Sequence, residues 1–267
     1  MYCSHSKKRR HLPYSCFTEK ELLVFADVLN IPSNDLLWKN IDSKLHCEGK
    51  EGCWLDNEYV RRQIKKTHPD LYETIYHFAL KPKGTKNRTD WMTTKEIDEV
   101  MKQFETDEFK FVGCMPSDYF LINKNEIPTI LNNTKKYSAI VFNLDETDEV
   151  GSHWVAMFFT NDDDDNITIE YFDSIGDPMI DNFKKLISSD FFRKKNIVLK
   201  VNTKKHQYGD NECGIYAMYY IISRINGETP EYINSKTISD DEMNRYRDVL
   251  FRPFTMKRSE NIDRTRE

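Results

Sequence analysis

A polar, glycine-containing loop over residues 206–214 leads directly into an apolar run over 215–222, and this junction limits the possible folds most. The run has the length of a helix and is followed by Asn226-Gly227, a common helix end. Cys213 is therefore predicted at a helix N-terminus, where unpaired N–H groups and the helix macrodipole favour an anion. Such a position generally lowers the pKa of a thiol and favours a reactive thiolate.

Gln207 lies six residues before Cys213, and its side-chain amide can donate a hydrogen bond to an oxyanion that forms beside the thiol. A buried structural cysteine is the alternative, because most cysteines behave as small, inert apolar residues. A base and an orienting carboxylate elsewhere in the chain would favour the reactive cysteine over the structural one.

Two predicted strands supply that base and that carboxylate. His153 precedes an apolar strand over 154–159, Asp173 follows a second strand over 167–172, and four consecutive aspartates mark the turn between them. In a hairpin, the start of the first strand lies beside the end of the second. Asp173 can then hold one imidazole nitrogen of His153 while the other faces Cys213. Taken alone, His153 is typical of a surface or capping residue and Asp173 of a turn residue. Only their combination with Cys213 predicts a base and an orienting carboxylate.

In chain order, these motifs resemble those of the adenain and SUMO-specific protease clan of cysteine peptidases. The resemblance covers roughly residues 89–255 and rests on His153-Trp154, Phe172-Asp173-Ser174, and Gln207 with 211–214. The stretch from Trp91 to Ile97 also resembles a Trp-Leu-x-x-x-x-Ile segment of that catalytic domain.

Within the clan, the sequence is most similar to the polyprotein-processing proteases of large nucleocytoplasmic DNA viruses, of the African swine fever virus type. Those proteases also carry a helical N-terminal region with a Cys-Trp-Leu segment, which here is Cys53-Trp54-Leu55.

The resemblance implies an α+β fold: a papain-like, SUMO-protease-like catalytic domain whose central helix bears the catalytic cysteine and packs against a mixed sheet. It implies peptide hydrolysis by a triad of Cys213, His153 and Asp173, with Gln207 in the oxyanion hole and no metal or organic cofactor. Trp154 resembles the clan's cleft-lining tryptophan, which narrows the substrate channel and implies cleavage after Gly-Gly-like sites.

Charge divides the chain near residues 80–90. Residues 1–88 carry 16 Lys+Arg and 11 Asp+Glu, a net charge of +5, whereas residues 89–267 carry 23 and 33, a net charge of −10. The negative charge of the second part argues against a catalytic domain that binds nucleic acid. We expect a helical domain over 1–88 with a disordered stretch over 1–12, a catalytic domain over 89–255, and a mobile charged tail over 256–267.

Local signals place the individual elements. Capping boxes at Thr18/Glu21 and Thr93/Glu96 predict helix starts. Trp91 is expected to pack at the start of the second of these helices; because the resembling segment of the clan flanks the cleft, lining of a substrate subsite is the alternative. Further helices are predicted over 35–45, after a cap at Asp56, from Pro69, over 180–186 and over 239–250, the last with Met243, Tyr246, Val249 and Leu250 inward; strands are predicted over 109–115, 138–144 and 196–202.

The six cysteines lack the spacing of a disulfide framework, so a reducing, intracellular setting is expected; they are Cys3, Cys16, Cys47, Cys53, Cys114 and Cys213. A zinc site at Cys47 and Cys53 is disfavoured by their C-x5-C spacing. The sequence has no run of eighteen apolar residues and no apolar N-terminal signal, so neither a membrane contact nor secretion is expected. We therefore expect a location in the host cytoplasm or viral factory, or in the virion.

The expected partner is a protein substrate with glycine-rich cleavage sites, and the helical N-terminal region is expected to dock it or another partner. A basic stretch offers a weak contact for nucleic acid or a localisation signal; it comprises Lys7, Lys8, Arg9 and Arg10.

Four functions remain open from the sequence. The first is a viral endopeptidase that matures structural polyproteins, and the second is a protease that releases SUMO-like or ubiquitin-like modifiers. An acetyltransferase shares the order His, acidic residue, Cys, but nothing in the sequence suggests a coenzyme A pocket. A binding protein with a relic triad is the fourth, and the intact triad and oxyanion positions argue against it.

Overall fold

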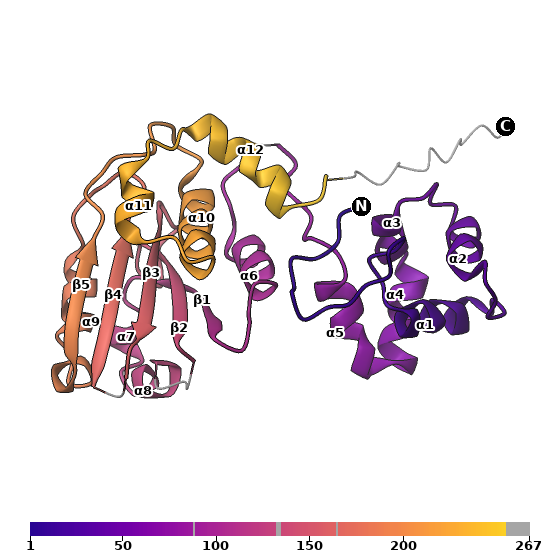
Figure 1. The fold of residues 1–267 in the computed structure, drawn as a ribbon, viewed down its shortest axis with the longest axis horizontal. Helices are drawn as coiled ribbons and strands as arrows, with labels where there is room; N and C mark the ends of the chain where they lie inside the picture. The colour runs from indigo at the N-terminus through magenta and orange to yellow at the C-terminus, as the bar shows by residue number, and fades with distance from the viewer. Residues whose placement is uncertain (88, 132–134, 164, 255–267) are drawn as a thin grey trace, which may run out of the picture.

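The computed structural model describes residues 1–87, 89–131, 135–163 and 165–254, so the tail predicted over 256–267 lies outside the described residues. Figure 1 shows a group of helices in the N-terminal third and a sheet covered by helices in the rest of the chain. Among the described residues, no helix is both long enough and apolar enough to cross a membrane.

The N-terminal helices surround an aromatic cluster with its own core. Their bounds are α1 Glu19–Leu29, α2 Leu37–Leu45, α3 Glu51–Asp56, α4 Glu58–Thr67 and α5 Pro69–Phe78. Trp54 is fully buried and contacts Phe17, Phe25 and Trp38. The predicted capping box of Thr18 and Glu21 is present. The cap predicted at Asp56 was wrong: Asp56 ends α3, and the side chain of Asn57 caps α4 by accepting the N–H of Val60.

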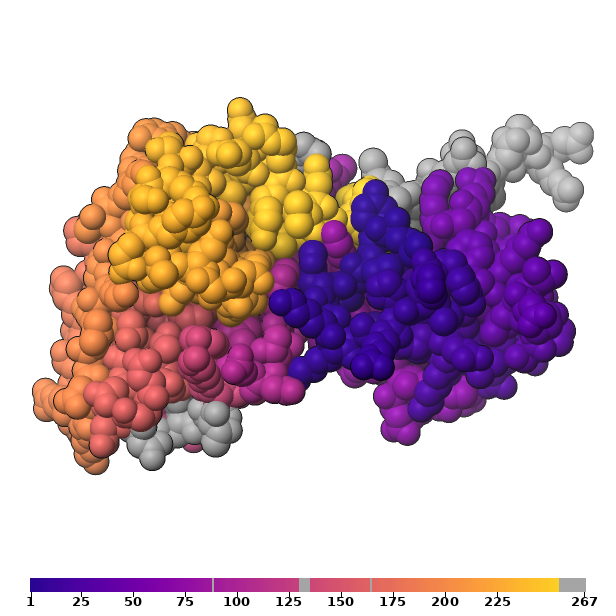
Figure 2. All heavy atoms as spheres, viewed as in Figure 1, coloured from indigo at the N-terminus to yellow at the C-terminus, as the bar shows by residue number. Residues whose placement is uncertain are grey.

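The first twelve residues are half-buried or exposed, but several of them bond to the rest of the protein, which differs from the disorder predicted for 1–12. Cys3 forms a β-bridge with Leu80. The half-buried Arg9 pairs with the buried Glu21 at 2.5 Å, which offsets the cost of burying that carboxylate. Figure 2 shows this indigo segment between the purple helices and the magenta and yellow parts of the molecule. We call residues 1–10 the strap.

Ion pairs of the strap weaken the predicted contact with nucleic acid. Lys8 pairs with Asp107 at 2.7 Å, and Arg9 pairs with Glu21. Two of the four cations predicted to offer a phosphate contact are therefore already neutralised within the protein.

Two disulfides contradict the expectation of reduced cysteines. Cys3 bonds Cys16 with a Cα–Cα distance of 4.8 Å, and Cys47 bonds Cys53 at 5.7 Å. Both distances suit a disulfide. Sequence spacing could not indicate these pairs, because the first depends on how the strap lies against the start of α1 and the second on the turn between α2 and α3. Cys114 and Cys213 remain free.

A five-stranded mixed sheet forms the second part of the chain, in the order β1-β2-β3-β4-β5. Its strands are β1 Phe109–Pro116, β2 Tyr137–Asn143, β3 Trp154–Asn161, β4 Asn166–Phe172 and β5 Asn196–Val201. β1 and β2 are parallel, as are β4 and β5, whereas the central pairs β2–β3 and β3–β4 are antiparallel. The predicted hairpin is therefore formed by β3 and β4, and it contains the central strand of the sheet.

Both faces of the sheet are covered by helices (Figure 1). On β3, Ala156 and Phe158 face the core that contains α10, while Val155 and Met157 face the opposite core, as the period of two along a strand requires. The first face carries α6 Thr94–Lys102, α10 Cys213–Ile225, α11 Pro230–Ser235 and α12 Asp240–Leu250; the second carries α7 Tyr119–Ile122, α8 Glu126–Leu131, α9 Asp181–Ile187 and the short 3-10 helix Phe192–Lys194.

Helix α12 begins with the capping box of Ser239 and Glu242. Met243 and Leu250 pack inward as predicted, but Val249 is 48% exposed, so its predicted inward position was wrong. Arg247 is buried instead. The face of α12 that packs inward is therefore turned away from the face that the apolar residues of the sequence predicted.

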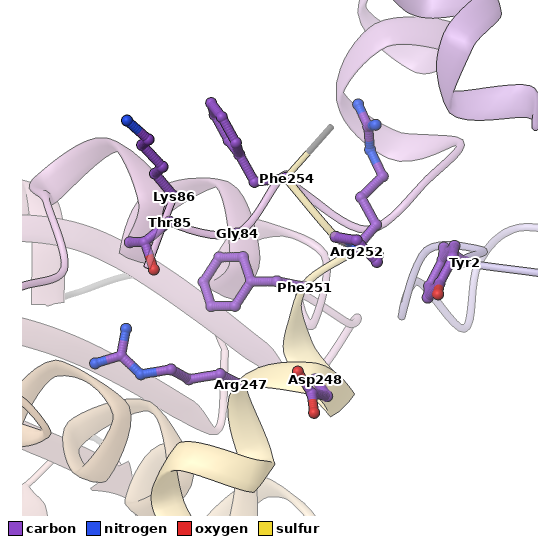
Figure 3. A pocket seen from close by; sticks show the side chains of 10 residues that line it. Tyr2, Gly84, Thr85, Lys86, Arg247, Asp248, Phe251, Arg252 and Phe254 are labelled. Carbon is purple, nitrogen blue, oxygen red and sulfur yellow. The ribbon is translucent and has the colours of Figure 1, made fainter. Parts of the chain in front are cut away.

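The end of α12 also meets the linker after α5. Gly84 donates its N–H to the carbonyl of Arg252, and Arg252 donates its N–H to that of Pro82. A cavity of about 510 Å³ lies at this junction, lined by Tyr2, Arg247 and Phe251 among others (Figure 3). The cavity contains no predicted site residue.

Candidate active site

The candidate nucleophile, Cys213, is the first residue of α10, as the sequence predicted, and it is 4% exposed. The adjacent Gly214 allows a close approach: a Cβ there would lie 2.9 Å from the Cβ of Met92, which precedes α6. The Cys-Gly pair therefore lets the segment before α6 lie against the tip of α10 and beside the thiol.

The candidate base, His153, lies just before β3, and Asp173 lies just after β4. Their strands pair so that Ala156 is opposite Phe172, which brings the two side chains together at the same edge of the sheet. Nε2 of His153 is 2.7 Å from Oδ1 of Asp173. The exposed fractions are 12% for the His153 side chain and 1% for that of Asp173, so water screens this pair little.

Opposing effects act on His153. Burial alone would lower its pKa, but hydrogen bonds to Asp173 and Cys213, and the charges of these two partners, outweigh burial and raise the pKa to about 9. The imidazole is therefore cationic at neutral pH beside a carboxylate and a sulfur. This is the arrangement that a thiolate–imidazolium pair requires.

Asp173 is itself held in place. Its Oδ1 also accepts the N–H of Ile175 at 2.9 Å, and its backbone carbonyl accepts a hydrogen bond from the side-chain amide of Asn202 at 2.7 Å. These bonds fix the carboxylate that orients His153. No local pattern in the sequence predicts the role of Asn202.

Gln207 is 3% exposed, and both ends of its amide have partners. The hydroxyl of Ser174 donates to its Oε1 at 2.7 Å, and its Nε2 donates to the carbonyl of Gly209 at 2.8 Å. The backbone N–H of Gln207 also bonds the carbonyl of Ser174. Ser174 thus connects the loop of Gln207 to the end of β4, next to Asp173.

The two tryptophans near the site differ in how exposed they are. Trp154 is only 8% exposed, and its indole N–H donates to the carbonyl of Met92 at 2.9 Å, so most of its ring belongs to the core. Trp91 is 48% exposed and hydrogen-bonds Asn211, two residues before Cys213. Of the two roles expected for Trp91, this exposure favours the lining of a substrate subsite over structural packing at the start of α6.

Arg247 is a residue of the site that sequence reasoning missed. From α12 it donates to the carbonyls of Asp90 at 3.0 Å and Asn211 at 2.8 Å. Burial lowers its pKa. It ties the segment of Trp91 to the loop before Cys213.

Cys114 does not compete as a nucleophile. Burial and then the charge of Asp98 raise the pKa of its thiol well above the ordinary value. Its segment is a strand and not a helix N-terminus. Among the described residues, no group of three or more His, Cys, Asp and Glu side chains could hold a metal ion.

Comparisons with known proteins identify related proteases. The model of the Ulp1 protease family, C-terminal catalytic domain, matches residues 62–259. R355 of Acanthamoeba polyphaga mimivirus, which bears the name of a thiol protease, is 29% identical over 245 residues, covering 85% of this chain and 78% of R355. S273R of African swine fever virus (isolate Pig/Kenya/KEN-50/1950), named a SUMO-1 cysteine protease, is 25% identical over 233 residues, covering 78% of this chain and 84% of S273R.

The crystal structure of the African swine fever virus pS273R protease shares the fold. It superposes with a TM-score of 0.70 at 21% identity, over 95% of this chain and 96% of that one. This shared fold confirms the predicted α+β class, and the family match confirms the resemblance to the clan.

Proposed function

The chain belongs to the Ulp1 protease family of cysteine peptidases, and on that basis we propose that Cys213, His153 and Asp173 form its catalytic triad. The observation that carries the proposal is the buried 2.7 Å bond between His153 and Asp173 beside a thiol at the tip of α10. His153 and Asp173 come from separate elements, and together they lie beside the sulfur of Cys213. A base oriented by a carboxylate next to a thiol is the arrangement of covalent thiol catalysis.

The mechanism assigns one task to each group. The Cys213 thiolate attacks the scissile carbonyl carbon, and the electron pair of the C=O bond moves to oxygen. The Gln207 amide and the N–H of Cys213 hold this oxyanion. The His153 imidazolium gives its proton to the leaving amine as the C–N bond breaks. His153 then takes a proton from water, which attacks the thioester, and Cys213 is released as thiolate.

We extend the proposal to the substrate class: extended, glycine-rich segments such as Gly-Gly sites in viral structural polyproteins. Exposed Trp91 and the small exposed part of Trp154 would form the walls of a narrow channel beside Cys213. Side-chain-free glycines would pass such a channel. The proposed role is virion maturation, in the infected cell or in the virion, and what supports it is that both relatives are viral proteases.

Release of SUMO-like modifiers is the second candidate. The name of the African swine fever virus relative, SUMO-1 cysteine protease, is what favours it. A modifier ends in an extended tail, so the same triad and channel serve both candidates. Only the substrate distinguishes them.

A peptide library tests the proposal. Wild type and Cys213→Ala would digest a diverse set of peptides, with the products read by mass spectrometry. We expect cleavage after glycine by the wild type only. Cleavage by Cys213→Ala would exclude Cys213 as the nucleophile, and cleavage sites without glycine would exclude the proposed substrate class.

A further inference from the structure

Asp240, the first residue of α12, joins three parts of the molecule. Its Oδ2 accepts the backbone N–H groups of Tyr208 at 3.0 Å and Gly209 at 2.8 Å. Its Oδ1 accepts the hydroxyl of Tyr216 at 2.9 Å. Tyr216 belongs to α10, one turn after Cys213, so a single carboxylate connects the loop before the nucleophile, the nucleophile helix and α12.

The peptide groups around Gly209 link Asp240 to Gln207. Asp240 accepts the N–H of Gly209, and the carbonyl of the same residue accepts one hydrogen of Gln207 Nε2 at 2.8 Å. A primary amide nitrogen carries two hydrogens. The Gly209 carbonyl accepts one of these hydrogens, and the Ser174 hydroxyl donates to the amide oxygen. Together these two bonds fix the plane of the amide and therefore the direction of its second hydrogen.

Two carboxylates lie so close to residue 209 that a side chain there would have to displace one of them. A Cβ on Gly209 would lie 2.7 Å from Oε2 of Glu212 and 3.5 Å from Oδ2 of Asp240. Glu212 is 5% exposed and accepts a hydrogen bond from Asn244 of α12 at 2.9 Å. The loop thus lies between the carboxylate of Asp240, which belongs to α12, and that of Glu212, which is hydrogen-bonded to α12.

We propose that Asp240 is a positioning residue for the oxyanion hole: it holds Gly209 so that the Gln207 amide keeps its second N–H aimed at the developing oxyanion. The inference rests on the proposed function, because it assumes acyl transfer at Cys213. Asp240 does not touch the substrate. Its effect reaches the reaction through Gly209 and Gln207.

The test uses the full-length chain and a library peptide that the wild type cleaves. Asp240→Ala frees the N–H groups of Tyr208 and Gly209 to bond with water, and we expect kcat to fall about tenfold with KM within about twofold, since an oxyanion donor acts mainly in the transition state. Asp240→Asn keeps one acceptor oxygen and should lose less. Asp241→Ala is the matched control, because Asp241 is exposed in the same helical turn and lies outside these contacts.

A double-mutant cycle shows whether Asp240 acts through Gln207. In a Gln207→Ala background, Asp240→Ala should reduce kcat no further, because the donor that it positions is gone. Alkylation of Cys213 by iodoacetamide forms no oxyanion, so its rate should match the wild type in both Asp240 variants. A purely structural defect would slow alkylation as well.

Three results would overturn the inference: unchanged kcat in Asp240→Ala, equal losses in the two backgrounds, or a parallel loss of alkylation in Asp240→Asn. Failure of the proposed function looks different, because the wild type itself would then cleave no library peptide.

Discussion

His153 makes the stability of the folded protein depend on pH. Its pKa is raised to about 9 in the folded protein, above the ordinary value near 6.5. A raised pKa means that the folded state binds the proton more tightly than the unfolded state does. The contribution of His153 to the free energy of unfolding is therefore fully present below about pH 6.5, and it is lost as pH rises through about 9.

We therefore expect the wild type to lose stability relative to His153→Gln, on the order of 2 kcal/mol, between about pH 6 and pH 9.5. Urea unfolding of both proteins across this range measures the difference. A difference that does not change with pH would show that His153 is not cationic in the folded protein.

At the same scale, the sequence predicted His153, Asp173 and Cys213 because each follows from a local pattern: a strand start, a strand end and a helix start. The hairpin then brought the first two together as predicted. Asp240 and Arg247 could not be predicted, because their contacts depend on where a distant helix packs. Exposure of the two tryptophans likewise depends on tertiary packing.

At the scale of the element, prediction succeeded where local signals were strong. The capping boxes that begin α1 and α6 are present, and α10 covers the predicted apolar run. Strand β3 is buried on both faces, which explains its unbroken apolar sequence.

Short helices were the elements that sequence reasoning overlooked. α3, α7 and α8 span six residues or fewer, too few to show a helical period. α11 did carry local signals, since Thr229 caps it and Pro230 is its first residue. These two signals suffice to predict a helix start at this position.

At the scale of the whole molecule, the strap joins the helical part to the sheet-containing part. The backbone N–H of His5 donates to the side chain of Gln103 at 3.2 Å, and the His5 ring stacks on Phe104. The disulfide between Cys3 and Cys16 fixes one end of the strap to the helical part. Neither the disulfide nor the order of the strap could be read from the sequence, because polar composition alone indicates disorder.

Removal of that disulfide should loosen the strap selectively. In Cys3→Ser/Cys16→Ser we expect faster hydrogen exchange at the N–H groups of Ser4 and His5, which bond Ala79 and Gln103, and a stability loss of about 2–4 kcal/mol. Cys47→Ser/Cys53→Ser is the matched control, because it removes the other disulfide and leaves the strap contacts in place. Equal exchange of the strap in the two variants would contradict this account.

The most direct test of the central claim is the pH dependence of iodoacetamide alkylation, followed at Cys213 and Cys114 in the same molecules by peptide mass spectrometry. If His153 and Cys213 form an ion pair, Cys213 should react rapidly at pH 6, while Cys114, whose pKa is raised, reacts slowly. In His153→Ala the reaction at Cys213 should become slow at pH 6 and recover toward pH 8.5, as for an ordinary thiol. Alkylation of Cys213 no faster than that of Cys114 at pH 6, or unaffected by His153→Ala, would contradict the proposed triad.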